Sequence, residues 1–249
     1  MIAGLEWGGL AIGAAAFLLA GIARGYAGFG LSAIVVAALT VVLPPAEVAP
    51  IAILLEVTAS VLQAPGIWRR IDWRTLALLL VGAAVGNPVG VAGLVWLSAD
   101  TARIAIALII MIAAILLLTG IKARRASGPV GAIGAGFASG VANGLSALGG
   151  LPIALLLVAR SDQPAVIRAT MIGYFFLLDT YGGLLFAHQG LMTSLVFERM
   201  ALGLPLVLIG LLVGGRMFAT TDPRSFRKIV LGLLIALAAV GLIRGALGS

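Results

Sequence analysis

Long apolar stretches, separated by short polar or glycine-rich segments, run through the whole chain. Runs such as RIAIALIIMIAAILLLTG (103–120) are continuously apolar. They lack the alternation of polar and apolar residues that marks a strand of a membrane β-barrel, so they predict helices. A helix that crosses a membrane needs about 20 residues. Six segments meet this requirement: Val48–Ala64, Thr75–Leu97, Ile104–Ile121, Ala165–Ala187, Met200–Phe218 and Ile229–Leu247.

Two further apolar segments are too long for one helix and are interrupted near their centres by glycines. They are Gly8–Leu43 and Gly131–Ala159, and their arms are about 14 residues long. Such interruptions predict discontinuous helices or hairpins that meet inside the membrane. Whether each segment makes two crossings or re-enters, we expect it to return to the side on which it began.

The chain also repeats itself. GYAGFGLS (25–32) has a counterpart in GVANGLSALGG (140–150), and GNPVGVAGLVWLSADTAR (86–103) parallels GLLVGGRMFATTDPRSFR (210–227). Each half then contains one broken segment and three full spans, and this odd count turns the second half upside down. The sequence predicts an all-α, polytopic membrane protein with 8–10 transmembrane segments, in which residues 1–121 and 129–249 form inverted repeats joined by a basic linker, 122–128.

Composition supports a lipid environment. The chain has 249 residues, of which 62% are hydrophobic and 10% are charged, whereas a soluble domain carries roughly 25% charged residues. Most of the surface must therefore face the lipid bilayer. Cysteine is absent, which excludes disulfides and thiolate metal sites. No Lys or Arg precedes Arg24, so we expect the first apolar segment to be retained and not cleaved as a signal peptide.

The net charge of +7 follows from where the basic residues lie and does not indicate nucleic acid as a partner. Following the chain through the predicted spans places twelve of the 16 Lys and Arg residues on one side. Basic loops favour the cytoplasm, so we expect this side to be cytoplasmic and both termini to face outward. The four clusters are Arg69/Arg70/Arg74, Lys122/Arg124/Arg125, Arg160/Arg168 and Arg216/Arg224/Arg227/Lys228; Arg103, Arg199 and Arg244 fall on the opposite side.

Arg24 stands between two apolar arms, where a charge needs a partner, a water-filled cavity or a function. One interpretation is an arginine that snorkels to the membrane interface. The other is a contact to an anion, because the guanidinium fork fits sulfonate or carboxylate oxygens and a helix that starts near Gly30 adds its positive end. The candidate substrate site comprises Arg24, Gly25, Tyr26, Gly28, Phe29, Gly30 and Ser32, with Asn143, Ser146, Gly149 and Gly150 of the second half as neutral donors. Close helix packing is the alternative role for the small residues and for Asn143.

Two acids, Glu56 and Asp179, fall deep inside predicted spans, where an ionised carboxylate is expensive. Each is either part of a buried ion pair, with Arg24 as a candidate partner, or a site that takes up and releases a proton. Asn87 and Pro88 interrupt the span Thr75–Leu97. They predict a helix kink that serves packing or lines a cavity.

Several function classes lack the residues they need. The sequence has neither an HExxH pair nor a GxSxG elbow, and its one histidine cannot form a metal cluster. A P-loop is also absent. We therefore expect no enzyme activity, no metal and no cofactor. A carrier and a channel both remain, since half-helices also build selective pores.

The glycine-rich first segment followed by LPPAEVAP (43–50), and its repeat GFASGVANGLSALGGLPIALLL (136–157), resemble the sulfite exporter TauE/SafE family of bacterial membrane permeases. The resemblance extends over nearly the whole chain. It implies secondary transport of small sulfur-containing anions, such as sulfite or organosulfonates, commonly outward across the inner membrane. Proton-coupled uptake of an organic anion is the alternative, followed by an anion channel. The oligomeric state is left open, with a homodimer as one option.

Overall fold

The computed structural model describes residues 7–40, 42–98, 101, 104–105, 108, 128–160, 163–220, 222 and 225. The predicted span Ile229–Leu247, nearly all of the span Ile104–Ile121 and the linker up to residue 127 lie outside the described residues. Within the described part of the chain every regular element is a helix. The all-α prediction is therefore confirmed.

Eight α-helices and two short 3₁₀ turns are described. They are α1 (Trp7–Ala27), α2 (Leu31–Leu39), α3 (Pro45–Gln63), η1 (Ala64–Gly66), η2 (Trp68–Arg70), α4 (Trp73–Trp96), α6 (Pro129–Ser146), α7 (Gly150–Arg160), α8 (Pro164–His188) and α9 (Ser194–Thr220). Four segments are long and apolar enough to cross a membrane: Pro45–Gly66, α4, α8 and α9. They overlap the four predicted spans of this region, so the chain is a multi-pass helical membrane protein.

The helices begin where local chemistry favours a start. Proline occupies the first helical position of α3, α6 and α8, where its missing N–H group costs nothing. Asp72 caps α4, because its carboxylate accepts a hydrogen bond from the backbone N–H of Thr75 at 3.1 Å. The long spans therefore start close to the positions that the apolar pattern predicts.

Both broken segments are helical hairpins, whose short second arms fold back along their long first arms. In the second, Arg160 at the end of α7 donates to the carbonyl of Gly128, just before α6, at 2.9 Å. In the first, a Cβ placed on Gly13 of α1 would lie 3.6 Å from Cδ2 of Leu39, which ends α2. Both segments fold back on themselves, and the return of each to the side of the membrane on which it began stays a prediction.

The prediction of arms of about 14 residues is wrong. The arms have 21 and 9 residues in the first hairpin and 18 and 11 in the second. The chain reverses only where the backbone enters the left-handed region, at Gly28 (φ 80°) and Gly30 (φ 96°) and, in the second hairpin, at Ala147 (φ 59°). The apolar pattern alone does not locate these reversals.

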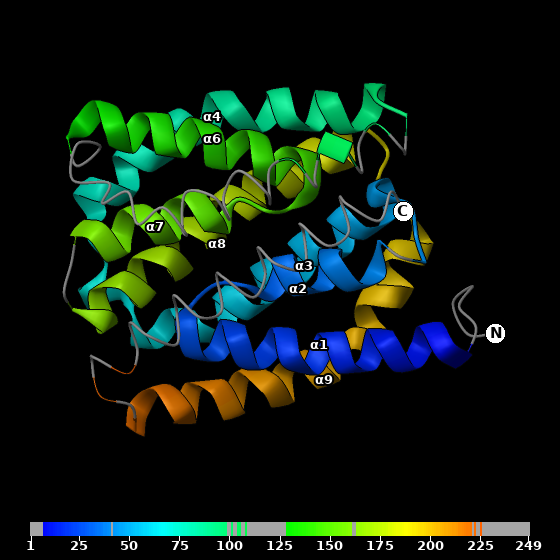
Figure 1. The fold of residues 1–249 in the computed structure, drawn as a ribbon, viewed down its shortest axis with the longest axis horizontal. Helices are drawn as coiled ribbons and strands as arrows, with labels where there is room; N and C mark the ends of the chain where they lie inside the picture. The colour runs from blue at the N-terminus through cyan, green and yellow to red at the C-terminus, as the bar shows by residue number, and fades with distance from the viewer. Residues whose placement is uncertain are drawn as a thin grey trace.

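The two hairpins pack their long arms against spans from the other half of the chain. Figure 1 shows α4 and α6 side by side along one edge, α1 and α9 along the opposite edge, and α2, α3, α7 and α8 between them. Glycines allow these close approaches. A Cβ on Gly140 of α6 would lie 2.7 Å from the carbonyl oxygen of Ala83, and one on Gly25 of α1 would lie 2.5 Å from that of Leu211.

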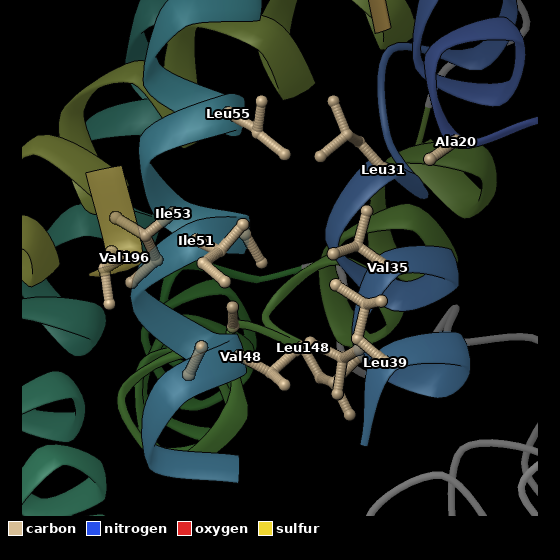
Figure 2. Packing of buried hydrophobic residues seen from close by; sticks show 14 of the residues in the cluster. Ala20, Leu31, Val35, Leu39, Val48, Ile51, Ile53, Leu55, Leu148 and Val196 are labelled. Atoms are coloured by element: carbon tan, nitrogen blue, oxygen red, sulfur yellow. The ribbon is translucent and has the colours of Figure 1, made fainter. Parts of the chain in front are cut away.

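An apolar core fixes the short helix α2 against α3. Figure 2 shows Leu31 and Val35 of α2 facing Ile51 and Leu55 of α3, and all four side chains are fully buried. This packing matters for the site because it holds Ser32, in the first turn of α2, beside Glu56 of α3.

Candidate functional site

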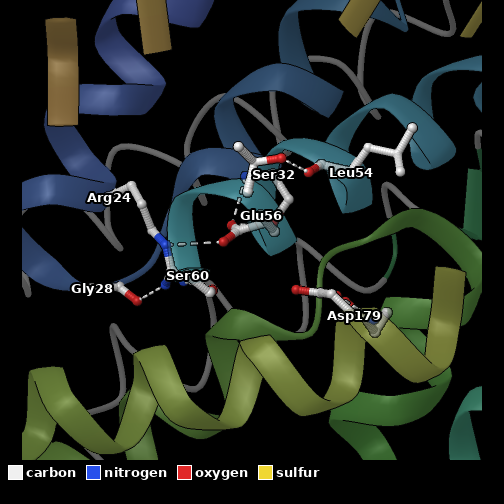
Figure 3. Close-up of polar contacts among 9 residues, drawn as sticks. Arg24, Gly28, Ser32, Leu54, Glu56, Ser60 and Asp179 are labelled. Atoms are coloured by element: carbon white, nitrogen blue, oxygen red, sulfur yellow. Dashed lines mark hydrogen bonds and ion pairs between the residues drawn. The ribbon is translucent and has the colours of Figure 1, made fainter. Parts of the chain in front are cut away.

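Arg24, in the last turn of α1, is fully buried and does not reach the protein surface. Its Nε lies 3.0 Å from Oε2 of Glu56, its Nη2 donates to Oγ of Ser60 at 2.6 Å, and its Nη1 donates to the carbonyl of Gly28 (Figure 3). The guanidinium carbon also lies 5.2 Å from the centre of the Phe175 ring. Arg24 and Glu56 thus form an ion pair, and the enclosed side chain of Arg24 does not snorkel to a surface of the protein. Uptake and release of a proton by Glu56 stays a prediction.

Glu56 completes a binding arrangement suited to a carboxylate. Its Oε1 accepts hydrogen bonds from the backbone N–H of Ser32 at 3.1 Å and from the Ser32 hydroxyl at 3.0 Å. The N–H groups of the first turn of a helix have no partner within the helix, and the positive end of the helix dipole attracts anions there. A guanidinium, a hydroxyl and a helix N-terminus therefore surround one carboxylate.

The residues that link α1 to α2 divide between turn geometry and packing. Gly28 and Gly30 supply the left-handed backbone of the reversal, and Phe29 is buried between them. Gly25 lies in the contact with α9, and its carbonyl accepts from Nη2 of Arg168 at 2.8 Å. Tyr26 packs its ring edge-on to Phe218, with 6.4 Å between the ring centres.

A second buried polar cluster joins α4, α6 and α8. Nδ2 of Asn143 donates to Oδ1 of Asp179 at 2.9 Å, and Nδ2 of Asn87 donates to the carbonyl of Leu178 at 3.4 Å. Among the described residues, nothing donates to Oδ2 of Asp179 or to the side-chain oxygens of the two asparagines. α4 continues as a helix through Pro88, so the cavity-lining role of Asn87 and Pro88 stays a prediction.

Other predicted donors of the second half are already engaged within the protein. The Ser146 hydroxyl donates to the carbonyl of Ala142 at 2.9 Å, and the carbonyl of Gly149 accepts from Ser139 at 2.6 Å. A Cβ on Gly150 would lie 3.1 Å from the Phe175 ring, so Gly150 makes room for this ring. A role for Ser146, Gly149 or Gly150 in anion binding stays a prediction.

The two polar clusters share one chain spacing. Arg24 and Ser60 lie 36 residues apart, and so do Asn143 and Asp179. Arg24 and Asn143 each lie four residues before the first left-handed residue of their hairpin, Gly28 and Ala147. By this spacing Ser60, and not Glu56, stands to Arg24 as Asp179 stands to Asn143.

Ser60, Phe175 and Arg168 contact the site or its hairpin but were not predicted from the sequence. Ser60 could have been found, because it follows Glu56 by four residues and residues at this spacing share one face of a helix. Phe175 reaches Arg24 from another helix, and Arg168 reaches Gly25 from the same helix as Phe175. No local pattern reports such contacts.

The fold and the buried charges thus describe a multi-pass helical membrane protein with an arginine site inside it. The family model described as sulfite exporter TauE/SafE matches residues 13–241, and the chain belongs to this family. A protein of Cupriavidus necator named "Probable sulfite/organosulfonate exporter TauE" is 30% identical over 221 residues, covering 85% of each chain. No solved structure matches the chain. The family consists of membrane transporters and not of enzymes, as the resemblance of the sequence implied.

Proposed function

We propose that this protein is a secondary transporter that exports small sulfur-containing anions, such as sulfite or organosulfonates, across the bacterial inner membrane. The name of the Cupriavidus relative supports this substrate class and direction. The observation that carries the proposal for this chain is the fully buried guanidinium of Arg24 beside the N-terminus of α2. A charge at this depth is a functional site by default, and both elements favour anions.

Export is favoured energetically. A monovalent anion that leaves an inside-negative cell gains about 2.3 kcal/mol for each 100 mV of membrane potential. Outward transport therefore requires no coupling ion. The alternative is proton-coupled uptake, in which the buried acids Glu56 and Asp179 would carry the protons. An anion channel is a third candidate, and flux that does not saturate with substrate concentration would distinguish it from a carrier.

The arrangement of the helices supports alternating access between two inverted halves, residues 1–121 and 129–249. The long arm of each hairpin packs on a span of the other half, α1 on α9 and α6 on α4. In transporters built from inverted repeats, one such unit rocks against the other around a site near the membrane midplane. The Arg24 cluster lies at the reversal of the first hairpin, which suits this role.

A ligand screen tests the proposal. Purified protein is titrated with sulfite, methanesulfonate, sulfate and acetate while thermal unfolding is followed. We expect sulfite or the sulfonate to stabilise the wild type and Arg24→Ala to abolish this effect. Arg24→Lys should retain part of it, because the ammonium keeps the charge but loses the planar fork.

The matched control is Arg216→Ala, which removes an exposed arginine of α9. It should bind like the wild type. Normal anion binding by both Arg24 variants would contradict the proposed site, and saturating counterflow in proteoliposomes would separate a carrier from a channel.

A further inference from the structure

The carboxylate of Glu56 occupies the place that the chemistry of the site offers to an anion. We infer that Glu56 is a tethered competitor of the transported anion, which must displace it from Arg24 and from the N-terminus of α2. This inference rests on the proposed function, because it concerns how the same site is regulated. It assigns Glu56 a role beyond that of a structural ion pair.

The donors around Glu56 are those that a sulfite or sulfonate group would use. One carboxylate oxygen takes both the backbone N–H and the hydroxyl of Ser32, and the other lies 3.0 Å from Nε of Arg24 (Figure 3). A sulfonate has three oxygens and can accept the same hydrogen bonds. Two anions cannot share these donors, because like charges at such separations repel strongly in a dry interior.

Displacement also keeps the arginine compensated. Arg24 and Glu56 are 0% and 1% exposed, and a buried charge without a partner is strongly destabilising. When the substrate enters as Glu56 withdraws, the guanidinium always faces one anion. An unloaded site is then neutral, which disfavours occupation by unrelated anions.

The surroundings of Glu56 allow it to be exchanged. Among the described residues, its carboxylate is held only by groups on two other helices, Arg24 of α1 and Ser32 of α2. Its own helix α3 supplies Ser60 as a separate partner of Arg24. Withdrawal of Glu56 therefore leaves the Ser60 hydroxyl and the Gly28 carbonyl on the guanidinium, and frees the backbone N–H and the hydroxyl of Ser32 as donors. Arg24 stays in position for the incoming anion.

The test compares the binding of sulfite and of methanesulfonate by the wild type and by Glu56→Gln. If Glu56 leaves the site free for about a tenth of the time, it weakens the apparent affinity for the anion tenfold. We therefore expect Glu56→Gln to bind sulfite and methanesulfonate at least about tenfold more tightly than the wild type does. Without an anion this variant should unfold at a lower temperature than the wild type, and sulfite should restore the loss. Glu47→Gln is the matched control, because it removes an acid of the same helix that pairs with a different arginine, Arg199; its affinity should equal that of the wild type.

A second variant tests the same site by chemical rescue. Glu56→Ala leaves the place of the carboxylate vacant, so acetate should stabilise this variant but not the wild type, and sulfite should compete with acetate. If the wild type binds sulfite and neither Glu56 variant binds it more tightly, the inference is overturned and the proposed function stays intact. Failure of both variants to fold in saturating sulfite or acetate would overturn it as well. If the wild type and both variants fold but none binds a sulfur anion, the proposed function itself is wrong.

Discussion

Asp179→Asn should stabilise the protein, because the carboxylate is buried and half satisfied. Asn143 donates to Oδ1 of Asp179 at 2.9 Å, and no group in the described part of the chain donates to Oδ2. The introduced amide keeps the acceptor for Asn143 and adds an N–H donor to a cluster in which the side-chain oxygens of Asn87 and Asn143 also lack partners among the described residues. An unsatisfied buried polar group costs about 1–3 kcal/mol, so the free energy of unfolding should rise by an amount within about this range.

The assay is thermal unfolding of the purified protein in detergent at constant pH and salt. A gain of 1 kcal/mol corresponds to a rise in Tm of about 2–4 °C for a chain of this size. Glu198→Gln is the control, because it makes the same chemical change at an exposed position of α9 and should change stability by less than about 0.5 kcal/mol. A clear loss of stability in Asp179→Asn would show that the carboxylate is ionised and held by a cation, and would refute this reasoning.

The same variant tests whether export needs a proton on Asp179. If outward transport runs without proton coupling, Asp179→Asn and Glu56→Gln should both keep substantial counterflow in proteoliposomes. Flux that collapses in these variants, and with a proton ionophore at zero membrane potential, would instead indicate a proton-coupled permease.

Three further predictions concern topology, packing and pH. A cysteine at Ser127 should resist an impermeant thiol reagent in intact cells and one at Ser249 should react, because the basic loops are expected inside; the opposite pattern would reverse the topology. Gly140→Ala should lower the free energy of unfolding by about 1–3 kcal/mol, since its Cβ would lie 2.7 Å from the carbonyl oxygen of Ala83. The control Gly134→Ala, on the same helix, should leave the free energy of unfolding unchanged, because its Cβ would meet nothing within 4 Å. Equal effects of the two variants would refute the packing argument. Burial alone would raise the pKa of Asp72, but hydrogen bonds from Thr75 and the charge of Arg160 outweigh it and lower the pKa. The ionised carboxylate therefore stabilises the fold at pH values above its ordinary pKa. Thermal unfolding should show that the stability advantage of the wild type over Asp72→Ala shrinks as the pH falls below about 4.

The spans and the two hairpins could be predicted because lipid imposes a strong one-dimensional constraint. Every backbone group in the membrane must be satisfied within a helix, so apolar length alone located α3, α4, α8 and α9. Glycine clusters marked both interruptions. The helix start expected near Gly30 is confirmed, because α2 begins at Leu31. The reversal of the second hairpin could not be placed, because it depends on the left-handed Ala147, which is not a glycine.

The pairing of Arg24 with Glu56 was open from the sequence for a different reason. An arginine and a glutamate 32 residues apart can meet only if α2 folds back and packs on α3, and that packing is set by apolar side chains such as Leu31 and Leu55. Sequence therefore identified the charged groups, whereas the tertiary packing determined which donor each carboxylate received. The engagement of Ser146 within its own helix was equally hidden.

The two polar clusters share one chain spacing but differ in charge, which predicts the number of anions bound. The first hairpin places the cation of Arg24 against Ser60, whereas the second places the neutral amide of Asn143 against the acid Asp179. A sulfur anion at the second cluster would meet a carboxyl group and unpartnered oxygens, with no cation from α4, α6 or α8 among the described contacts. We therefore expect isothermal titration of the wild type to give one anion per chain, and none in Arg24→Ala. Two anions per chain, or one that persists without Arg24, would mean that the second hairpin also binds substrate.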